Sequence, residues 1–222
     1  QPPPQTMSSS EELQLYSYWR SSCSYRVRIA LAHKSLAYTY HAVSLLAGEQ
    51  TEDGYTELNP SKLLPALVLA DGTVIGQSTA ILEFLEEAYP DAPKLLPEDP
   101  LARAYVRQAV AMIAADIQPV QNLRVLKYVG MDRKIEWGAH WIATGFDALE
   151  AFLAKHAGNY CIGDELSLAD ACLVPQVYNA RRFGIDVETK YPIIARIDAA
   201  LNEIEAFKAA HPDNMPDAQV SA

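Results

Sequence analysis

Two kinds of hydrophobic pattern divide the chain, and the first of them occupies its N-terminal part. Short apolar runs at residues 13–18 and 38–43 predict two strands, because compact or alternating runs of this length are typical of sheets. Between them, residues 24–33 repeat their apolar positions at the helical period and predict a helix. The chain is therefore expected to begin with a strand-helix-strand unit.

The next apolar positions predict a hairpin and a second helix. An Asp-Gly pair separates the runs 66–69 and 73–75, and this pair between two short strands is a frequent hairpin turn. Ser78 follows, and its hydroxyl is expected to cap the helix that begins there. The predicted order over residues 11–90 is strand-helix-strand and then strand-strand-helix.

Beyond residue 90 the strand signals stop. Several prolines interrupt all periodicity and predict a linker over residues 91–100. After the linker, apolar positions recur at the helical period, so residues 101–222 are predicted to form an all-helical domain. Residues 1–10 are rich in proline, serine and glutamine and are expected to be a disordered tail. The predicted helical segments are 101–127, 136–156, 168–183 and 193–207.

Two features of the helical part have a direct structural interpretation. Ser167 and Asp170 have the spacing of a capping box, in which the serine oxygen accepts from a backbone N–H and the carboxylate reaches back. We interpret this pair as a folding signal without a catalytic part. Pro119 lies inside the first predicted helix, where it is expected to bend the chain, and bends of this kind often border a cleft.

Composition and charge exclude several classes of function. Half of the 222 residues are apolar and 21% are charged, as in ordinary globular proteins. The formal net charge of −10 argues against a nucleic-acid partner, and no apolar stretch reaches the roughly 20 residues of a membrane span. Cys23, Cys161 and Cys172 are widely spaced, which argues against a metal site and favours a reducing compartment. We therefore expect a cytoplasmic protein without a metal ion.

The strongest candidate chemistry lies where the first strand meets the first helix, at the sequence Ser21-Ser22-Cys23-Ser24. Free backbone N–H groups and the positive end of a helix dipole stabilise an anion there, and a nearby hydroxyl can hydrogen-bond a thiolate. A thiol with a pKa of about 8.5 can then ionise near neutral pH. Helix capping by a serine is the plainer alternative. Cys23 is either a nucleophile itself or a small buried residue.

With this turn and the two-part organisation in view, residues 13–217 resemble the cytosolic glutathione transferases, and within them the zeta class. The first block of the resemblance is highly specific, whereas the shorter ones are weak individually. The blocks are Ser21-Ser22-Cys23-Ser24-Tyr25-Arg26-Val27-Arg28-Ile29-Ala30-Leu31, Leu58-Asn59-Pro60, Leu64-Pro65, Gln77-Ser78, Ile117-Gln118-Pro119, Gln121-Asn122-Leu123, Leu173-Val174-Pro175-Gln176-Val177 and Arg182-Phe183.

The resemblance implies an α/β plus all-α fold. A thioredoxin-like, glutathione-binding domain is expected over residues 11–90, and the helical domain over residues 101–222 is expected to supply the second-substrate pocket. A homodimer is also implied. The implied activity is glutathione-dependent cis–trans isomerisation of maleylacetoacetate, a small dicarboxylic substrate, to fumarylacetoacetate in tyrosine and phenylalanine breakdown. Glutathione is regenerated and acts as a cofactor, and transferase activity on α-haloacids is expected as well.

The family roles assign the glutathione sulfur to the serine-rich turn. Ser21 is expected to stabilise the thiolate with Ser22 assisting, and Cys23 has a supporting role. The resemblance further implies a cis bond between Leu64 and Pro65, which lets the backbone of Leu64 pair with the cysteinyl part of glutathione.

The remaining family roles concern the carboxylates. Gln77 and Ser78 are expected to hold the γ-glutamyl carboxylate at a helix end, and Gln50 to contact the glycyl end. Arg182 and Arg26 are expected to bind carboxylates of the second substrate, since guanidinium groups do so in bidentate fashion. Arg181 is expected to be solvated. Further glutathione contacts are expected at Ser24, Tyr25, Arg26, Gln118, Asn122, Leu123 and Arg124.

Three alternatives stay open on the sequence. Maleylpyruvate isomerase shares the implied fold and the arginine region. A non-catalytic binding module of the same fold belongs to a different functional class, although the intact serine-rich turn speaks against it. A thiol oxidoreductase that uses Cys23 is the third.

Overall fold

The computed structural model describes residues 13–130 and 132–218, and these form two compact units. The first unit holds the described residues up to Lys94 together with those from Glu205 onward, and the second unit is Leu95–Ile204. The units divide inside the stretch 91–100 that the sequence predicts as a linker. The tail predicted over residues 1–10 lies outside the described residues.

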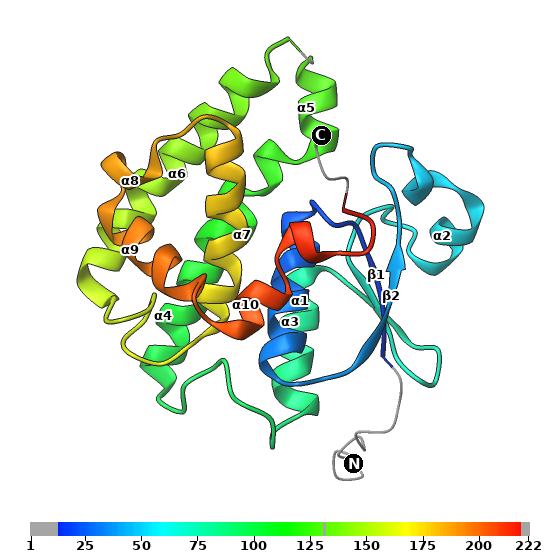
Figure 1. Ribbon diagram of the computed structural model, residues 1–222, viewed down its shortest axis with the longest axis horizontal. Coiled ribbons are helices and arrows are strands. Elements are labelled where there is room, and N and C mark those ends of the chain that lie inside the picture. The colour runs from blue at the N-terminus through cyan, green and yellow to red at the C-terminus, as the bar shows by residue number, and fades with distance from the viewer. Residues whose placement is uncertain (1–12, 131, 219–222) are drawn as a thin grey trace. The chain divides into compact units, whose positions relative to one another are not determined.

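The first unit is built on a four-stranded mixed sheet (Figure 1). Its strand order is β2-β1-β3-β4, with β1 parallel to β2 and antiparallel to β3, and β3 antiparallel to β4. Leu15 lies opposite Tyr40 on one side and Leu67 on the other. The strands are β1 Leu13–Ser17, β2 Tyr38–Ala42, β3 Ala66–Val68 and β4 Val74–Gly76.

Two helices of this unit pack against each other, α1 (Ser22–His33) and α3 (Ser78–Ala88). Every residue of α1 from Ser24 to Leu31 is buried, which is why its apolar and polar residues both belong to the interior. The predicted strand-helix-strand and strand-strand-helix order is confirmed. A short helix between them, α2 (Asp53–Leu58), escaped prediction because only Tyr55 of its six residues is buried.

The chain returns to the first unit at its C-terminal end. The helix α10 (Glu205–Ala209) packs against α1, and a short 3₁₀ turn, Pro212–Asn214, follows it. The predicted helix over 193–207 is therefore interrupted after α9, and its last residues lie in a different unit from its first.

The second unit is helical. Its longest element is α6, and α7 is its most buried, with twelve of its fifteen residues in the interior. Its helices are α4 Pro100–Ala111, α5 Leu123–Val129, α6 Lys134–His156, α7 Leu168–Arg182, α8 Val187–Lys190 and α9 Pro192–Leu201.

The single helix predicted over 101–127 is broken at Pro119. After α4 the chain widens into a π-helical segment, Met112–Ile117, and then tightens into the 3₁₀ turn Pro119–Gln121. The N–H of Gln118 donates to the carbonyl of Ile113, five residues back, at 2.9 Å. Proline cannot continue the helical hydrogen bonding because it has no N–H group, so the ladder changes register at this point.

The capping box predicted at the start of α7 is confirmed. The Asp170 carboxylate accepts from the N–H of Ser167 at 2.8 Å, from the Ser167 hydroxyl at 2.7 Å, and from the N–H of Cys161 at 2.9 Å. Burial raises the pKa of Asp170, and these hydrogen bonds oppose that shift. The contacts are local and structural, in agreement with the interpretation as a folding signal.

Within residues 13–130 and 132–218, no helix combines the length and apolar character needed to cross a membrane. The same residues contain no group of three His, Cys, Asp or Glu side chains arranged to hold a metal ion.

Candidate active site

The serine-rich turn forms the N-terminal end of α1. Ser21 is the N-cap, and its Oγ accepts the N–H of Ser24 at 3.2 Å. The N–H of Ser21 donates to the carbonyl of Tyr18 at 2.9 Å, which closes the turn. A serine hydroxyl that accepts one hydrogen bond still has its own O–H to donate. Capping and thiolate stabilisation by Ser21 are therefore compatible.

The next three side chains differ in exposure. Ser22 and Ser24 are buried, whereas Cys23 is half-buried. The hydroxyl of Ser24 has no hydrogen-bond partner among the described residues. Ser21 is half-buried whereas Ser22 is buried, and this greater exposure favours Ser21 over Ser22 as the donor to a bound sulfur.

The guanidinium of Arg26 is buried next to the start of α3. Arg26 is 1% exposed, and its Nη1 donates to Oγ of Ser78 at 3.2 Å. Its Nε and Nη2 have no hydrogen-bond partner among the described residues. An unpaired charge in the interior is costly, so such donors indicate a site that an anion completes.

The start of α3 differs from the prediction at Ser78. The N-cap is Gln77, no side chain caps the helix, and Ser78 is its first helical residue. Gln77 has a φ of 67°, which non-glycine residues rarely adopt. The Ser78 hydroxyl is turned to Arg26 instead of the helix end. The backbone N–H groups that open α3 are thus left for a ligand anion.

The Leu64-Pro65 peptide bond is cis, as the resemblance implies. Two side chains brace the residue before it, because Tyr55 Oη and Asn59 Nδ2 both donate to the carbonyl of Leu63, at 2.6 and 2.8 Å. Burial raises the pKa of Tyr55 to about 12, so its hydroxyl donates throughout the neutral range. β3 begins only at Ala66, which leaves the backbone of Leu64 outside the strand ladder.

Gln50 lies in the short 3₁₀ turn Glu49–Thr51. Its Oε1 is buried and lacks a hydrogen-bond partner among the described residues. An unpaired buried amide oxygen is an acceptor for a ligand N–H, which fits the contact predicted for this residue.

The candidates of the second unit gather at the break around Pro119. Gln118 is buried immediately before the proline, and Asn122 is the N-cap of α5, where its Oδ1 accepts from the N–H of Arg124 at 3.2 Å. Leu123 opens α5, and Arg124 is exposed. Gln118 and Asn122 therefore flank the break.

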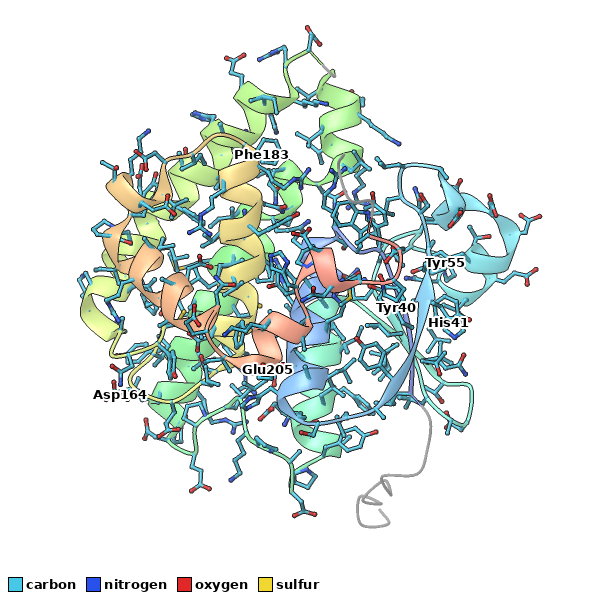
Figure 2. The ribbon with its side chains drawn as sticks, in the orientation of Figure 1. Tyr40, His41, Tyr55, Asp164, Phe183 and Glu205 are labelled. Carbon is cyan, nitrogen blue, oxygen red and sulfur yellow. The ribbon has the colours of Figure 1, made fainter. Side chains whose placement is uncertain are left out.

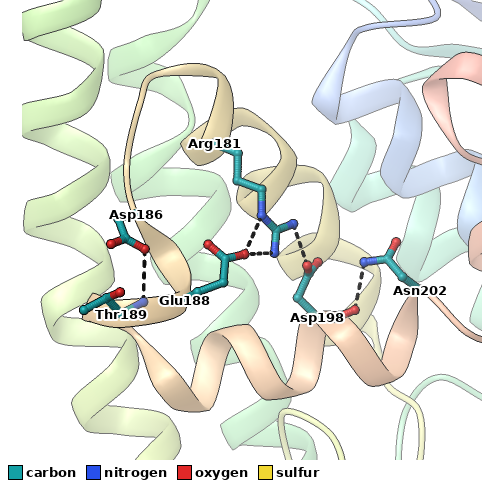
Figure 3. A network of polar contacts seen from close by, with 6 residues as sticks. All are labelled: Arg181, Asp186, Glu188, Thr189, Asp198 and Asn202. Atoms are coloured by element: carbon teal, nitrogen blue, oxygen red, sulfur yellow. Dashed lines mark hydrogen bonds and ion pairs between the residues drawn. The ribbon is translucent and has the colours of Figure 1, made fainter.

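The two arginines at the end of α7 have different surroundings. Arg182 is exposed, donates to Asn179 at 3.2 Å and lies over the ring of Tyr178. Arg181, expected to be solvated, forms ion pairs of 2.7 Å with both Glu188 and the buried Asp198 (Figure 3). Arg181 is exposed, as expected, but the sequence did not indicate the two carboxylates from neighbouring helices that pair with its guanidinium.

Sequence reasoning missed two residues of the first unit that contact the serine-rich turn and a third that bonds to one of them. Arg28 and Asp217 hold the backbone of Trp19, and Tyr40 on β2, labelled in Figure 2, donates to Asp217. The only available signal was a second arginine inside an apolar helix at Arg28. Nothing near Asp217 in the sequence indicates a partner almost two hundred residues away.

The comparisons with known proteins agree with this arrangement. Residues 20–88 match the family model of the glutathione S-transferase N-terminal domain, and residues 142–203 match that of the C-terminal domain. A probable maleylacetoacetate isomerase of Drosophila melanogaster is 53% identical over 94% of this chain and 92% of its own. The maleylacetoacetate isomerase of Rattus norvegicus is 52% identical over 91% of this chain and 94% of its own.

Solved structures are similar as well. The maleylacetoacetate isomerase of Anaeromyxobacter dehalogenans, solved with glutathione in its active site, is 46% identical with a TM-score of 0.86 and covers 95% of this chain and 99% of its own. A bacterial maleylpyruvate isomerase, described as a zeta-class glutathione S-transferase, is 44% identical with a TM-score of 0.88 over 93% of this chain and 100% of its own. The chain therefore belongs to the glutathione S-transferase family, in the zeta-class branch that contains the maleylacetoacetate isomerases.

Proposed function

We propose that this chain is an enzyme that catalyses the glutathione-dependent isomerisation of maleylacetoacetate to fumarylacetoacetate. The observation that carries the proposal is the Ser21 hydroxyl, which caps α1 and keeps its O–H available beside the first free amides of that helix. Close relatives that are named maleylacetoacetate isomerases support the choice of substrate.

The described residues fit glutathione as the cofactor. Its γ-glutamyl carboxylate suits the uncapped start of α3, with Gln77 and Ser78 in front and the unpaired donors of Arg26 behind. Its glycyl end suits the unpaired Oε1 of Gln50 through an N–H group. The backbone of Leu64 is available for its cysteinyl part.

When bound, glutathione supplies a thiolate that adds reversibly to the conjugated cis double bond, so that rotation about the resulting single bond and elimination give the trans product. Ser21 donates its O–H to the sulfur, and the amides of α1 add their dipoles, which together lower the thiol pKa. Ser22, Cys23, Ser24 and Tyr25 shape the turn that holds Ser21 in place.

The second unit is proposed to position the substrate. Arg182 is exposed and carries a guanidinium, the group best suited to a carboxylate. On the family resemblance, further glutathione contacts are proposed at the residues around the Pro119 break, Gln118, Asn122, Leu123 and Arg124. Because Arg26 is buried beside Ser78, we assign it to the γ-glutamyl end instead of to the substrate.

Maleylpyruvate is the second candidate substrate, because a zeta-class maleylpyruvate isomerase is among the structures that resemble this chain. It carries the same cis double bond between carbonyl and carboxylate groups, and the same residues would serve it. Conjugation of glutathione to α-haloacids such as dichloroacetate is proposed as a further activity of the site.

The test is turnover of maleylacetoacetate and of maleylpyruvate with and without glutathione. We expect isomerisation of maleylacetoacetate that requires glutathione and does not consume it. Good rates on maleylpyruvate with none on maleylacetoacetate would select the second candidate. Glutathione binding without turnover of either would leave a binding module.

We also propose a homodimer, on the family resemblance, and a cytoplasmic location, since widely spaced cysteines suit a reducing compartment. Sedimentation equilibrium of the purified chain tests the first proposal. A mass near 24.5 kDa, that of one chain, would contradict it.

A further inference from the structure

The C-terminal segment from Glu205 to Ala218 is a part of the first unit that the proposed chemistry does not use. It begins with α10 beside α1 and continues through the 3₁₀ turn Pro212–Asn214 (Figures 1 and 2). The family models end at residues 88 and 203, so the segment lies outside both. Its contacts nevertheless converge on the turn that carries Ser21.

Arg28 makes the first connection. This guanidinium is fully buried, and its Nε donates to the carbonyl of Ala210 at 3.1 Å. Its Nη2 donates to the carbonyl of Trp19 at 3.0 Å, and its Nη1 to the carbonyl of Tyr18 at 3.4 Å and the hydroxyl of Ser17 at 3.3 Å. One side chain of α1 thus joins the C-terminal segment to the residues that precede Ser21.

Asp217 makes the second connection. Its Oδ2 accepts the N–H of Trp19 at 3.0 Å, and its Oδ1 accepts the hydroxyl of Tyr40 at 2.7 Å. Burial raises the pKa of Tyr40, and the bond to Asp217 adds to this, so the hydroxyl stays protonated and orients the carboxylate. The N–H and the carbonyl of Trp19 are therefore held by two charged side chains, Asp217 and Arg28.

The third connection is apolar. Met215 and Ala218 pack against a buried cluster formed by Tyr18, Trp19, Val43, Tyr55, Leu64 and Ala66. Leu64 is the residue before the cis proline, and Tyr18 accepts the N–H of Ser21. The segment therefore packs against the cluster that contains Leu64 and Tyr18, the residues next to the proposed cysteinyl and thiol sites.

We propose that Glu205–Ala218 is a strap that positions the thiol-activating turn, and that Asp217 is its positioning residue. The inference rests on the proposed function. Without the Asp217 carboxylate, the N–H of Trp19 loses its acceptor and the turn from Tyr18 to Ser21 gains freedom. The Ser21 hydroxyl then spends less time at the sulfur, whereas the carboxylate site at the start of α3 is untouched. A displacement of about 1 Å in such a group can cost up to about 100-fold in rate.

The experiment compares Asp217→Ala, Asp217→Asn and Tyr40→Phe with the unaltered chain. The matched control is Asp213→Asn, an exposed carboxylate of the same segment. For Asp217→Ala we expect kcat to fall about tenfold, with KM for glutathione within about twofold of the unaltered chain. The pKa of the bound thiol, followed by ultraviolet titration, should rise. Asp217→Asn keeps one acceptor oxygen, so its kcat and its bound-thiol pKa should lie between those of Asp217→Ala and the unaltered chain. Tyr40→Phe should change both quantities in the same direction by a smaller amount.

Thermal unfolding separates positioning from folding. If Asp217→Ala does not fold, Asp217→Asn and Tyr40→Phe carry the test. A wild-type thiol titration and kcat in all folded Asp217 and Tyr40 variants would overturn the inference, as would a loss of rate that only follows the unfolded fraction. If the unaltered chain ionises bound glutathione but isomerises neither substrate, the proposed function fails while the titration still tests the strap.

Discussion

Two helix starts in the first unit, those of α1 and α3, differ in whether a side chain caps their free N–H groups. At α1 the Ser21 side chain caps the helix. At α3 no side chain does so, Gln77 has a positive φ, and the hydroxyl of Ser78 is bonded to Arg26. The first end has a side-chain cap that accepts one of its N–H groups, and the second has no side-chain cap.

The difference matches two of the anionic groups of glutathione, the γ-glutamyl carboxylate and the thiolate. A carboxylate is charged at every physiological pH, so its site can keep a permanent cation and open amides ready for it. A thiol must first lose a proton, and the thiolate must remain reactive. A hydroxyl and a helix end favour the thiolate by a hydrogen bond and by the helix dipole. Under the proposed function, recognition of glutathione belongs to the start of α3 and activation of its thiol to the start of α1.

The largest expected effect is on turnover when the α1 hydroxyl is removed. Ser21→Ala should lower kcat by about 100-fold, a typical loss for one donor aimed at a reacting anion, with a smaller change in KM for glutathione. Steady-state kinetics with maleylacetoacetate measure both values. Ser22→Ala is the matched control, because this buried hydroxyl lies one residue further into the helix, and it should cost clearly less. Equal losses in the two variants would contradict the assignment of activation to Ser21.

The next effect concerns the α3 end. Arg26→Met should raise KM for glutathione about tenfold with little change in kcat, because a charged donor behind the carboxylate site is lost. The ligand-free chain should unfold at the same or a higher temperature, since an unpaired buried cation is replaced by an apolar side chain. Arg28→Met is the control: its donors are all engaged, so that variant should be destabilised. A destabilised Arg26→Met with unchanged KM would make Arg26 merely structural.

A third helix start, in the second unit, sharpens the contrast. At α7 the Asp170 carboxylate accepts from two backbone N–H groups and a hydroxyl, so this end is both capped and closed to ligands. Asp170→Asn should lower the free energy of unfolding by about 1 to 2 kcal/mol and leave KM for glutathione unchanged. Urea unfolding and kinetics of the same sample measure the two quantities. A large rise in KM would place this helix start in the binding machinery.

The smallest effect is a pH dependence that belongs to neither helix start. Burial raises the pKa of Tyr55 to about 12, against about 10 in the unfolded chain. Folding favours the neutral phenol. Its contribution to the free energy of unfolding is therefore complete below about pH 10 and is lost as the pH rises through about 12. Tyr55→Phe should lower stability by about 1 kcal/mol near neutrality and flatten the alkaline decline. Urea midpoints at several alkaline pH values measure this, and an unchanged decline would contradict it.

Periodicity predicted most of the strands and helices of both units, because their faces are buried in a regular way. It failed where a backbone group or a distant partner decided the structure. The apolar pattern continued through Pro119, where the proline itself indicated the bend and the helix is broken, and α2 buries only Tyr55. The C-terminal return is held by Arg28 and Asp217, whose partners lie far away in the sequence.

The candidate site was predictable to a different degree. The resemblance supplied the residues, and the structure supplied their pairing. No local pattern indicates that Ser78 is bonded to Arg26 or that Gln77 opens α3 without a cap, since both depend on how α1 and α3 pack. The ion pairs of Arg181 were equally unpredictable, because its two carboxylate partners come from later helices and no sequence pattern around Arg181 indicates them.

The most direct test of the account is the ultraviolet pH titration of glutathione bound to the unaltered chain and to the Ser21→Ala/Ser22→Ala double variant. We expect the bound thiol to ionise well below its solution pKa of about 8.5 in the unaltered chain, and to return most of the way to that value in the double variant. Coincident titration curves, with turnover also unchanged, would contradict the claim that the start of α1 activates the sulfur.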